Sequence, residues 1–309
     1  MEPTAVVIAG PTCTGKSSAA VSLSLRIGGE IVSADSMQVY RGMDIGTAKI
    51  TREEMRGVPH HMIDVADPAD GMDVMVFRSA ALESIDDIFS RGMVPIIVGG
   101  TGFYIESLLF EPPEGDEGVD KGYRQRLKDE WERYGPEYMY ERLRAGDPAY
   151  AQTVHPNNRF RVIRALEYIH ATGRPYSSYV SGASGKTRFS FRCFVLDDDR
   201  RQLYSRIDSR VDSMIAAGFE DEVRRLMDAG LNRDSVAMQG IGYREMFDYL
   251  SGDVSLQDAV AAIKNGTRHI AKRQITWFRH RQYSEWIDVS QFGRDPERIA
   301  DEIVRRLTK

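Results

Sequence analysis

Cysteine is scarce in this sequence, with two residues among 309, and long apolar runs are missing. The two thiols, Cys13 and Cys193, provide neither a disulfide framework nor a zinc-ligand spacing, and they suit a reducing compartment. No apolar run approaches the roughly 20 residues of a membrane-spanning helix. The first residues contain no Arg-rich or apolar targeting stretch. We therefore expect a soluble, cytoplasmic protein without a membrane partner.

Acidic residues are missing from one stretch, 259–283, of a chain whose net charge is −5. Lys264, Arg268 and Lys272 recur there every four residues, which places them on one face of a helix. The negative net charge argues against a nucleic-acid partner, and a run of charges is commonly a solvated helix surface. Solvated helices, however, usually mix both signs of charge. The acid-free stretch therefore favours a polyanion partner.

A glycine-rich loop follows the apolar run Ala5–Ala9 and fits the pattern G-x-x-x-x-G-K-[ST]. In such a loop the backbone N–H groups and the next helix N-terminus converge on an anion, Lys16 adds a positive charge, and Ser17 can ligate Mg²⁺. The sequence thus predicts a site for a di- or triphosphate without specifying the compound. The loop residues are Gly10, Pro11, Thr12, Cys13, Thr14, Gly15, Lys16 and Ser17.

Apolar segments alternate with helical segments through most of the chain. This alternation predicts a parallel sheet with helices on both faces, where ligands bind beyond the carboxyl ends of the strands. We therefore expect an α/β fold with a P-loop NTPase-like parallel sheet as its core. The expected strands are 5–9, 30–34, 94–98 and 191–196, and the expected helices among them include 16–27 and 73–91.

The character of the sequence changes at a stretch rich in proline, glycine and acid, Glu111–Gly118. Helical periodicity alone follows over 120–172, with breaks at Gly135-Pro136 and Asp147-Pro148, and a Gly- and Ser-rich segment, 177–187, leads back to strand character. We expect an all-helical domain inserted into the core. The expected division is a core of 1–113 plus 188–309 and an insertion of 114–187.

Two polar groups follow expected strands at the edge where the phosphate loop lies. Asp35 is either a general base or Mg²⁺ organiser, or an aspartate that caps a turn. Thr101 lies within Gly99–Gly102, where it either contacts a substrate or caps the next helix. The residues alone leave both choices open.

Two further clusters have competing interpretations. The arginines of Asn157–Glu167 open a helix with Phe160 on its apolar side, and they either clamp phosphates or bases or form surface ion pairs, as Glu167 near Arg164 suggests. His60 and His61 resemble a metal pair only superficially. Adjacent histidines project in different directions, so we expect separate roles for the two rings.

The ordered set of motifs resembles the tRNA dimethylallyltransferase (tRNA isopentenyltransferase) family in its bacterial form, over nearly the whole chain. The motifs are GPTCTGKS, SADSMQVYRGMDIGTAK, HHMIDV, VGGTGFYI, NNRFRVIRALE, QGIGYRE and KRQITWFR. The resemblance implies transfer of a dimethylallyl group from dimethylallyl diphosphate to the exocyclic amine of the adenosine 3′ of certain anticodons. It also implies a P-loop core with a helical insertion and a monomer that binds tRNA and Mg²⁺.

The resemblance also implies a role for individual residues. Lys16 and the loop amides hold the diphosphate, Ser17 binds Mg²⁺, Asp35 is the base, and Thr101 orients the amine and leaving group. Arg210 matches the arginine of the family that contacts the diphosphate, with Arg206 as the alternative that sequence leaves open. The implied tRNA contacts are Asp35, Ser36, Met37, Gln38, Thr101, Tyr123, Arg159, Phe160, Arg161, Val162, Ile163, Gln239, Gly240, Ile241, Gly242, Tyr243, Arg244, Lys272, Arg273, Gln274, Ile275, Thr276, Trp277, Phe278 and Arg279.

Three details complete the expectations. Phe160, Trp277 and Phe278 lie among arginines and are either stacking surfaces for loop bases or core aromatics, with Phe160 favoured for stacking. Cys13 stands where the family commonly has alanine, so we hypothesise that the loop can be alkylated. The alternatives to the family's activity are an adenylate isopentenyltransferase, a nucleotide kinase or ATPase that uses the same loop, and a non-catalytic RNA-binding module.

Overall fold

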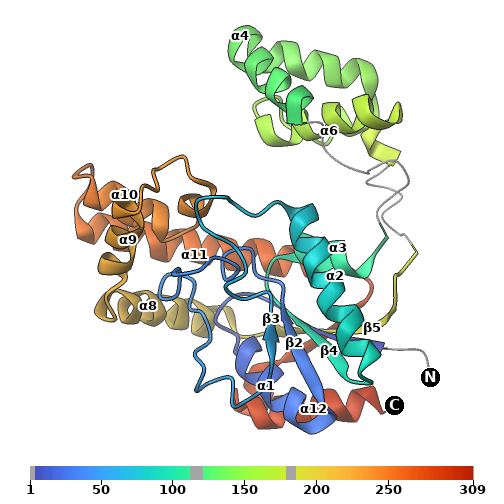
Figure 1. Ribbon diagram of the computed structural model, residues 1–309, viewed down its shortest axis with the longest axis vertical. Coiled ribbons are helices and arrows are strands. Elements are labelled where there is room, and N and C mark those ends of the chain that lie inside the picture. Colours follow the sequence, from blue (N-terminus) through green and yellow to red (C-terminus); the bar gives the residue numbers. More distant parts are fainter. Residues whose placement is uncertain (1–3, 112–120, 179–185, 309) are drawn as a thin grey trace. The chain divides into compact units, whose positions relative to one another are not determined.

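The structure is a computed structural model that describes residues 4–111, 121–178 and 186–308. It divides into two compact units, Met1–Leu109 with Phe189–Lys309, and Phe110–Arg188 (Figure 1). The boundaries predicted from the sequence are 113/114 and 187/188. Most of the Pro- and Gly-rich stretch 111–118 and of the Gly- and Ser-rich segment 177–187 lies outside the described residues.

The first unit contains a six-stranded parallel sheet of order β3-β2-β4-β1-β5-β6. Its central strands are almost entirely buried because both faces are covered, which explains their continuous apolar sequences. The strands are β1 (Thr4–Ala9), β2 (Gly29–Ser33), β3 (His60–His61), β4 (Val94–Val98), β5 (Ser190–Asp197) and β6 (Ser284–Asp288). The four strands expected from the sequence are therefore confirmed, with every end within one residue, and the α/β class is confirmed.

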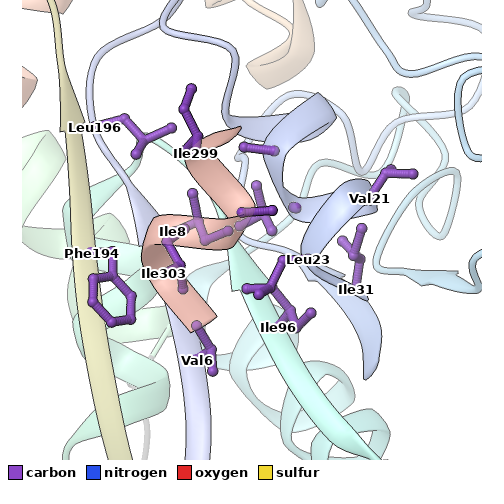
Figure 2. Close-up of a cluster of buried hydrophobic side chains, with 14 of the residues drawn as sticks. Val6, Ile8, Val21, Leu23, Ile31, Ile96, Phe194, Leu196, Ile299 and Ile303 are labelled. Carbon is purple, nitrogen blue, oxygen red and sulfur yellow. The ribbon is translucent and has the colours of Figure 1, made fainter. Parts of the chain in front are cut away.

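Helices cover both faces of the sheet. On one face α1 and α12 pack side by side, and Figure 2 shows Ile299 and Ile303 of α12 close to Val6 and Ile8 of β1. Alternate strand residues point to the other face, where α2 contacts β2 and β4. The helices of this unit are α1 (Lys16–Ile27), α2 (Val74–Ser90), α3 (Gly102–Leu109), α8 (Arg200–Ala216), α9 (Phe219–Asp228), α10 (Tyr243–Leu250), α11 (Leu256–Arg279) and α12 (Pro296–Leu307), with short 3₁₀ turns η1 (Val236–Gln239) and η2 (Val289–Phe292). None of the described helices is long and apolar enough to cross a membrane.

The second unit is helical, as its periodicity predicts, and consists of α4 (Lys121–Gly146), α5 (Pro148–Ala151) and α6 (Arg159–Thr172). The backbone of α4 is interrupted at Gly135, whose φ is 81°, and α5 starts after Asp147, whose side chain accepts the N–H of Tyr150. Both expected breaks are therefore present. One detail of the periodicity is wrong: Phe160 is 79% exposed, and Val162 is buried instead.

Two of the basic residues of α11 pair with acidic residues of another helix. Lys264 forms an ion pair with Asp212, and Arg268 with Asp208; both aspartates belong to α8, which packs alongside α11 (Figure 1). Lys264 and Arg268 therefore already have acidic partners within the protein, whereas Lys272 on the same face makes no ion pair within the described residues. The pattern of charges along one helix does not include the ion-pair partners that a neighbouring helix provides through tertiary packing.

Candidate functional site

The phosphate loop occupies the turn between β1 and α1, and its conformation depends on glycine at two positions. Gly10 has φ 131°, and a Cβ there would lie 2.2 Å from the backbone oxygen of Leu196. Gly15 has φ 84° and precedes the first turn of α1. Both conformations are rarely open to residues with a side chain. The loop amides and the α1 N-terminus thus form the concave backbone surface that binds phosphate groups.

Lys16 is the cation of this loop. Its Nζ donates a hydrogen bond of 2.7 Å to the carbonyl oxygen of Pro11, which also accepts the Thr14 hydroxyl at 2.9 Å. Burial and the nearby Arg210 lower the pKa of Lys16 to about 8, against a smaller opposing effect of Asp35. A bound phosphate would offset both effects, so this ammonium group is available to pair with an anion.

Asp35, Lys16 and Arg210 line the same cavity, together with Ser17 and Gly99. The cavity therefore joins the phosphate loop to the carboxyl ends of β2 and β4, as the parallel sheet predicts. It brings two cations, Lys16 and Arg210, and two carboxylates, Asp35 and Glu54, to a single hollow. A site of this composition can hold a diphosphate at one end and accept a proton at the other.

Arg210 and Arg206, which the sequence leaves as alternatives, have different surroundings. Arg210 Nη1 donates to the Thr12 hydroxyl at 3.4 Å and lines the cavity. Arg206 instead pairs with Asp198, whose side chain is fully buried and also receives two hydrogen bonds from Arg294. This arrangement supports Arg210 as the arginine of the phosphate site, while Arg206 belongs to a structural ion pair.

The carboxylate of Asp35 combines the two roles left open for it. Its Oδ1 accepts the backbone N–H of Met37 at 2.9 Å and of Gln38 at 3.4 Å, which fixes the turn. Its Oδ2 makes no hydrogen bond within the described part of the chain. One oxygen therefore holds the side chain in place, and the other remains available to a substrate in the cavity.

Gly99 and Gly100 allow two chain segments to approach closely beside Asp35. A Cβ at Gly99 would lie 2.3 Å from the carbonyl oxygen of Ala34, and one at Gly100 would lie 2.2 Å from Nε2 of Gln274. The next residue, Thr101, precedes α3, and its hydroxyl makes no hydrogen bond within the described residues. The helix-cap interpretation of Thr101 is thus not observed, and the hydroxyl is available to a ligand.

The segment Gln239–Arg244 lies against the turn that contains Asp35. A Cβ at Gly240 would lie 2.4 Å from the terminal methyl of Met37, so the structure brings two of the implied tRNA-contact segments together. Tyr243, however, is fully buried, and its hydroxyl donates to Glu222 at 2.6 Å. Burial beside this carboxylate raises the pKa of Tyr243. Its side chain is therefore part of the core rather than an exposed contact.

The second half of α11 divides into exposed and buried positions. Lys272 and Arg273 are exposed and make no ion pair within the described residues, whereas Phe278 is fully buried. For Phe278 the core interpretation therefore holds. Trp277 is half-buried, and the guanidinium carbon of Arg281 lies 4.8 Å from its ring centroid. Gln274 is directed toward the phosphate loop, where its side-chain oxygen accepts the N–H of Thr12.

The implied contacts in the helical unit also differ in their surroundings. Phe160 and Arg161 are exposed at the start of α6, where Asn158 caps the helix, and Arg159 forms an ion pair with Glu132. Tyr123 stacks on His170 with ring centroids 3.7 Å apart. Phe160 and Arg161 are therefore the members of this group that are free to contact a ligand, while the side chains of Val162 and Ile163 are buried.

The two histidines have separate roles, as expected. His60 contacts the carbonyl oxygen of Val58 through Nδ1 and lines the cavity, and its burial lowers its pKa. His61 contacts Glu30, which also binds Arg91. No group of three or more metal-ligating side chains occurs among the described residues.

Glu222 supports the cavity in a way that the sequence did not predict. Glu222 of α9 accepts the backbone N–H groups of Asp44, Ile45 and Gly46, and so fixes the loop whose next residues, Thr47 and Ala48, line the cavity. Glu222 is far from this loop in sequence, and no local pattern connects the two. The motif SADSMQVYRGMDIGTAK contains Gly46, but nothing in it points to a partner on α9.

Two family profiles match the chain. The profile described as IPP transferase covers residues 38–281, and the profile described as isopentenyl transferase covers residues 3–72. The second match contains the phosphate loop, and the two together contain Asp35 and the other residues that line the cavity.

Similar proteins share almost the full length of the chain. A tRNA dimethylallyltransferase of Geobacillus thermodenitrificans is 46% identical, over 98% of this chain and 95% of its own. The crystal structure of a tRNA isopentenylpyrophosphate transferase of Bacillus halodurans is 42% identical, with a TM-score of 0.72 over 99% of this chain and 97% of that chain.

A eukaryotic dimethylallyltransferase solved while acting on tRNA is similar over a smaller share of its length. It is 30% identical, with a TM-score of 0.77 over 89% of this chain and 70% of that chain. The profile match spans well over half of the chain, and the relatives match nearly all of it. The chain therefore belongs to the tRNA dimethylallyltransferase family of prenyltransferases.

Proposed function

We propose that this protein transfers the dimethylallyl group of dimethylallyl diphosphate to the exocyclic amine of the adenosine that follows the anticodon in tRNA, and releases diphosphate. The observation that carries the proposal is the shared cavity, in which the Asp35 carboxylate faces the same hollow as Lys16 and Arg210. A kinase can also place a carboxylate beside such cations, so the cavity fits the chemistry of the transfer without excluding phosphoryl transfer. The family membership supplies the identity of the two substrates.

The phosphate loop binds the leaving group. In the transfer, the bond between C1 of the dimethylallyl group and the diphosphate oxygen breaks, and negative charge grows on the diphosphate. Lys16, Arg210 and the amides at the α1 N-terminus stabilise that charge, in a partly closed hollow where such interactions are stronger than in water. The positive charges are already in place, so little reorganisation accompanies the step.

Asp35 activates the acceptor. An adenine amine is a weak nucleophile because its lone pair is delocalised into the ring. The Oδ2 atom of Asp35 accepts a hydrogen from this amine as the new bond from nitrogen to C1 forms, so the proton ends on the carboxylate. The two amides that hold Oδ1 keep the group oriented throughout. Thr101 lies between the end of β4, which pairs with β2, and the start of α3, and its hydroxyl orients the amine.

We also propose Mg²⁺ as the metal of the site. The Ser17 hydroxyl is exposed at the start of α1 and makes no hydrogen bond within the described residues, and Asp35 lines the same cavity. Mg²⁺ is commonly bound by one or two protein oxygens together with phosphate oxygens and water. The Ser17 hydroxyl and the Asp35 carboxylate fit this coordination. When bound, the ion would neutralise part of the diphosphate charge.

The RNA contacts come from exposed groups on both units. Lys272 and Arg273 on α11 suit phosphates, and Phe160 with Arg161 on α6 suits stacking on an unpaired base. The target base must leave the anticodon-loop stack to reach Asp35, at a cost of a few kcal/mol. We propose that these contacts offset that cost and that the protein acts as a monomer.

The test is the substitution Asp35→Asn, because asparagine keeps an oxygen for the turn amides while it removes the base. We expect kcat to fall about 10²- to 10⁴-fold, with the equilibrium Kd for the donor changed less than about threefold. The matched control is Asp70→Asn, an exposed carboxylate whose side chain makes no hydrogen bond within the described residues. Full activity of Asp35→Asn would remove Asp35 from the mechanism.

A further inference from the structure

Gln274 connects α11 to the phosphate loop across 262 residues of sequence. Its Oε1 accepts the backbone N–H of Thr12 at 3.0 Å. Its Nε2 occupies the space above Gly100, where an added Cβ would lie 2.2 Å away. A single side chain therefore touches both segments that border the cavity beside Asp35.

Thr12 is held from a second direction as well. Its hydroxyl accepts a hydrogen bond of 3.4 Å from Arg210, which lines the cavity with Lys16. When Gln274 holds the backbone of Thr12, it also limits where the hydroxyl that Arg210 contacts can lie. The position of the phosphate-binding arginine thus depends on a residue that does not itself line the cavity.

The direction of Gln274 separates it from its neighbours on α11. Lys272 and Arg273 are exposed and suit an RNA backbone, whereas Gln274 is only partly exposed and uses its amide group within the unit. Family resemblance alone places all three in one RNA-binding segment. The contacts of Gln274 therefore set it apart from the two exposed cations beside it.

We propose that Gln274 is a positioning residue for the diphosphate donor and not a contact for RNA. It holds the start of the phosphate loop in the shape that presents Arg210 and the loop amides to the leaving group. Such preorganisation raises affinity because the loop loses less freedom when the ligand binds. The proposal rests on the proposed function for the identity of the donor alone.

The test compares three variants on α11 by direct binding and by kinetics. Gln274→Leu leaves the Thr12 N–H without its acceptor, and we expect the Kd and KM for dimethylallyl diphosphate to rise about tenfold. The Kd and KM for an anticodon stem-loop RNA should change less than twofold, and kcat at saturating donor less than about threefold. Lys272→Ala should show the reverse pattern, with weaker RNA binding and unchanged donor affinity. Gln257→Leu, an exposed glutamine of the same helix without a hydrogen bond in the described residues, is the matched control.

A second pair of variants keeps the test valid if Gln274→Leu loosens the fold. Gly100→Ala should displace Nε2 of Gln274 and weaken donor binding several-fold in the native background. In a Gln274→Ala background the added Cβ no longer meets the glutamine and keeps only a 3.3 Å approach to the backbone oxygen of Gly10, so Gly100→Ala should have a clearly smaller effect. This non-additivity marks a shared contact.

The possible results distinguish a failure of this inference from a failure of the proposed function. A donor Kd unchanged by Gln274→Leu, or an RNA Kd raised as much as the donor Kd, would overturn the inference, as would additive effects of the Gly100 and Gln274 changes. These binding measurements need no group transfer. If the donor Kd rises in Gln274→Leu as expected but the native protein modifies no RNA, the proposed function would be overturned and this inference would stand.

Discussion

Glu222 provides the sharpest test of how the cavity is held together. This fully buried carboxylate accepts the N–H groups of Asp44, Ile45 and Gly46 at 2.9, 2.7 and 3.1 Å, and the hydroxyl of Tyr243 at 2.6 Å. Four donors point at two oxygens. The substitution Glu222→Gln keeps the shape and one acceptor oxygen, and replaces the other oxygen by an amide group that itself donates.

The cost follows from the hydrogen-bond count. A hydrogen bond to a charged group contributes about 1.5–3 kcal/mol, and a buried donor without a partner costs about 1–3 kcal/mol. Glu222→Gln weakens the bonds at one oxygen and opposes at least one N–H with another donor. We therefore expect the free energy of unfolding of the sheet-containing unit to fall by about 3–5 kcal/mol.

The assay is urea unfolding followed by tryptophan fluorescence in a Trp131→Phe background, so that the signal comes from Trp277 and Trp286 of that unit. The control is Glu220→Gln on the same helix, which loses only a partly exposed pair with Arg224 and should cost less than about 1 kcal/mol. A cost for Glu222→Gln no larger than that of the control would refute the reasoning.

Four further predictions concern the site. Because the pKa of Lys16 is lowered to about 8, the ammonium is charged below that pH and neutral above it, so donor affinity measured by calorimetry should fall as the pH rises through about 8 and should stay level in Lys16→Met. Arg210→Ala should raise the donor KM at least tenfold, whereas Arg206→Ala should mainly lower the Tm. Phe160→Ala should leave the Tm unchanged and weaken RNA binding about fivefold or more in a filter-binding assay, because the exposed ring contributes nothing to the core. Cys13 is 5% exposed, so a bulky thiol reagent should react far more slowly with the native than with the urea-unfolded protein, contrary to ready alkylation of the loop.

The sequence was most informative where function depends on contiguous residues. The apolar strands, the loop Gly10–Ser17 and the position of Asp35 at the end of β2 follow from local patterns, because parallel strands place their carboxyl ends at one edge. The cavity shared by Asp35 and Lys16 is the direct result. The breaks of the helical unit were also predictable, since glycine and proline act on their own backbone.

Contacts between distant segments were not predictable in this way. The acids that neutralise Lys264 and Arg268 lie on α8, and Glu222 and Gln274 reach loops far from them in sequence. Side-chain burial separated Phe278 in the core from Phe160 at the surface, although both lie among arginines. Such differences in burial depend on how whole helices and strands pack against one another, and the sequence pattern of a single helix does not show this.

The most direct test of the proposed activity follows the dimethylallyl group itself. The protein is incubated with labelled dimethylallyl diphosphate, Mg²⁺ and an anticodon stem-loop RNA or AMP, and the products are digested and analysed by mass spectrometry. We predict label on the adenosine 3′ of the anticodon in the RNA, and its loss in Asp35→Asn. Label on AMP would instead indicate an adenylate isopentenyltransferase, and ATP turnover without any transfer to RNA would contradict the account.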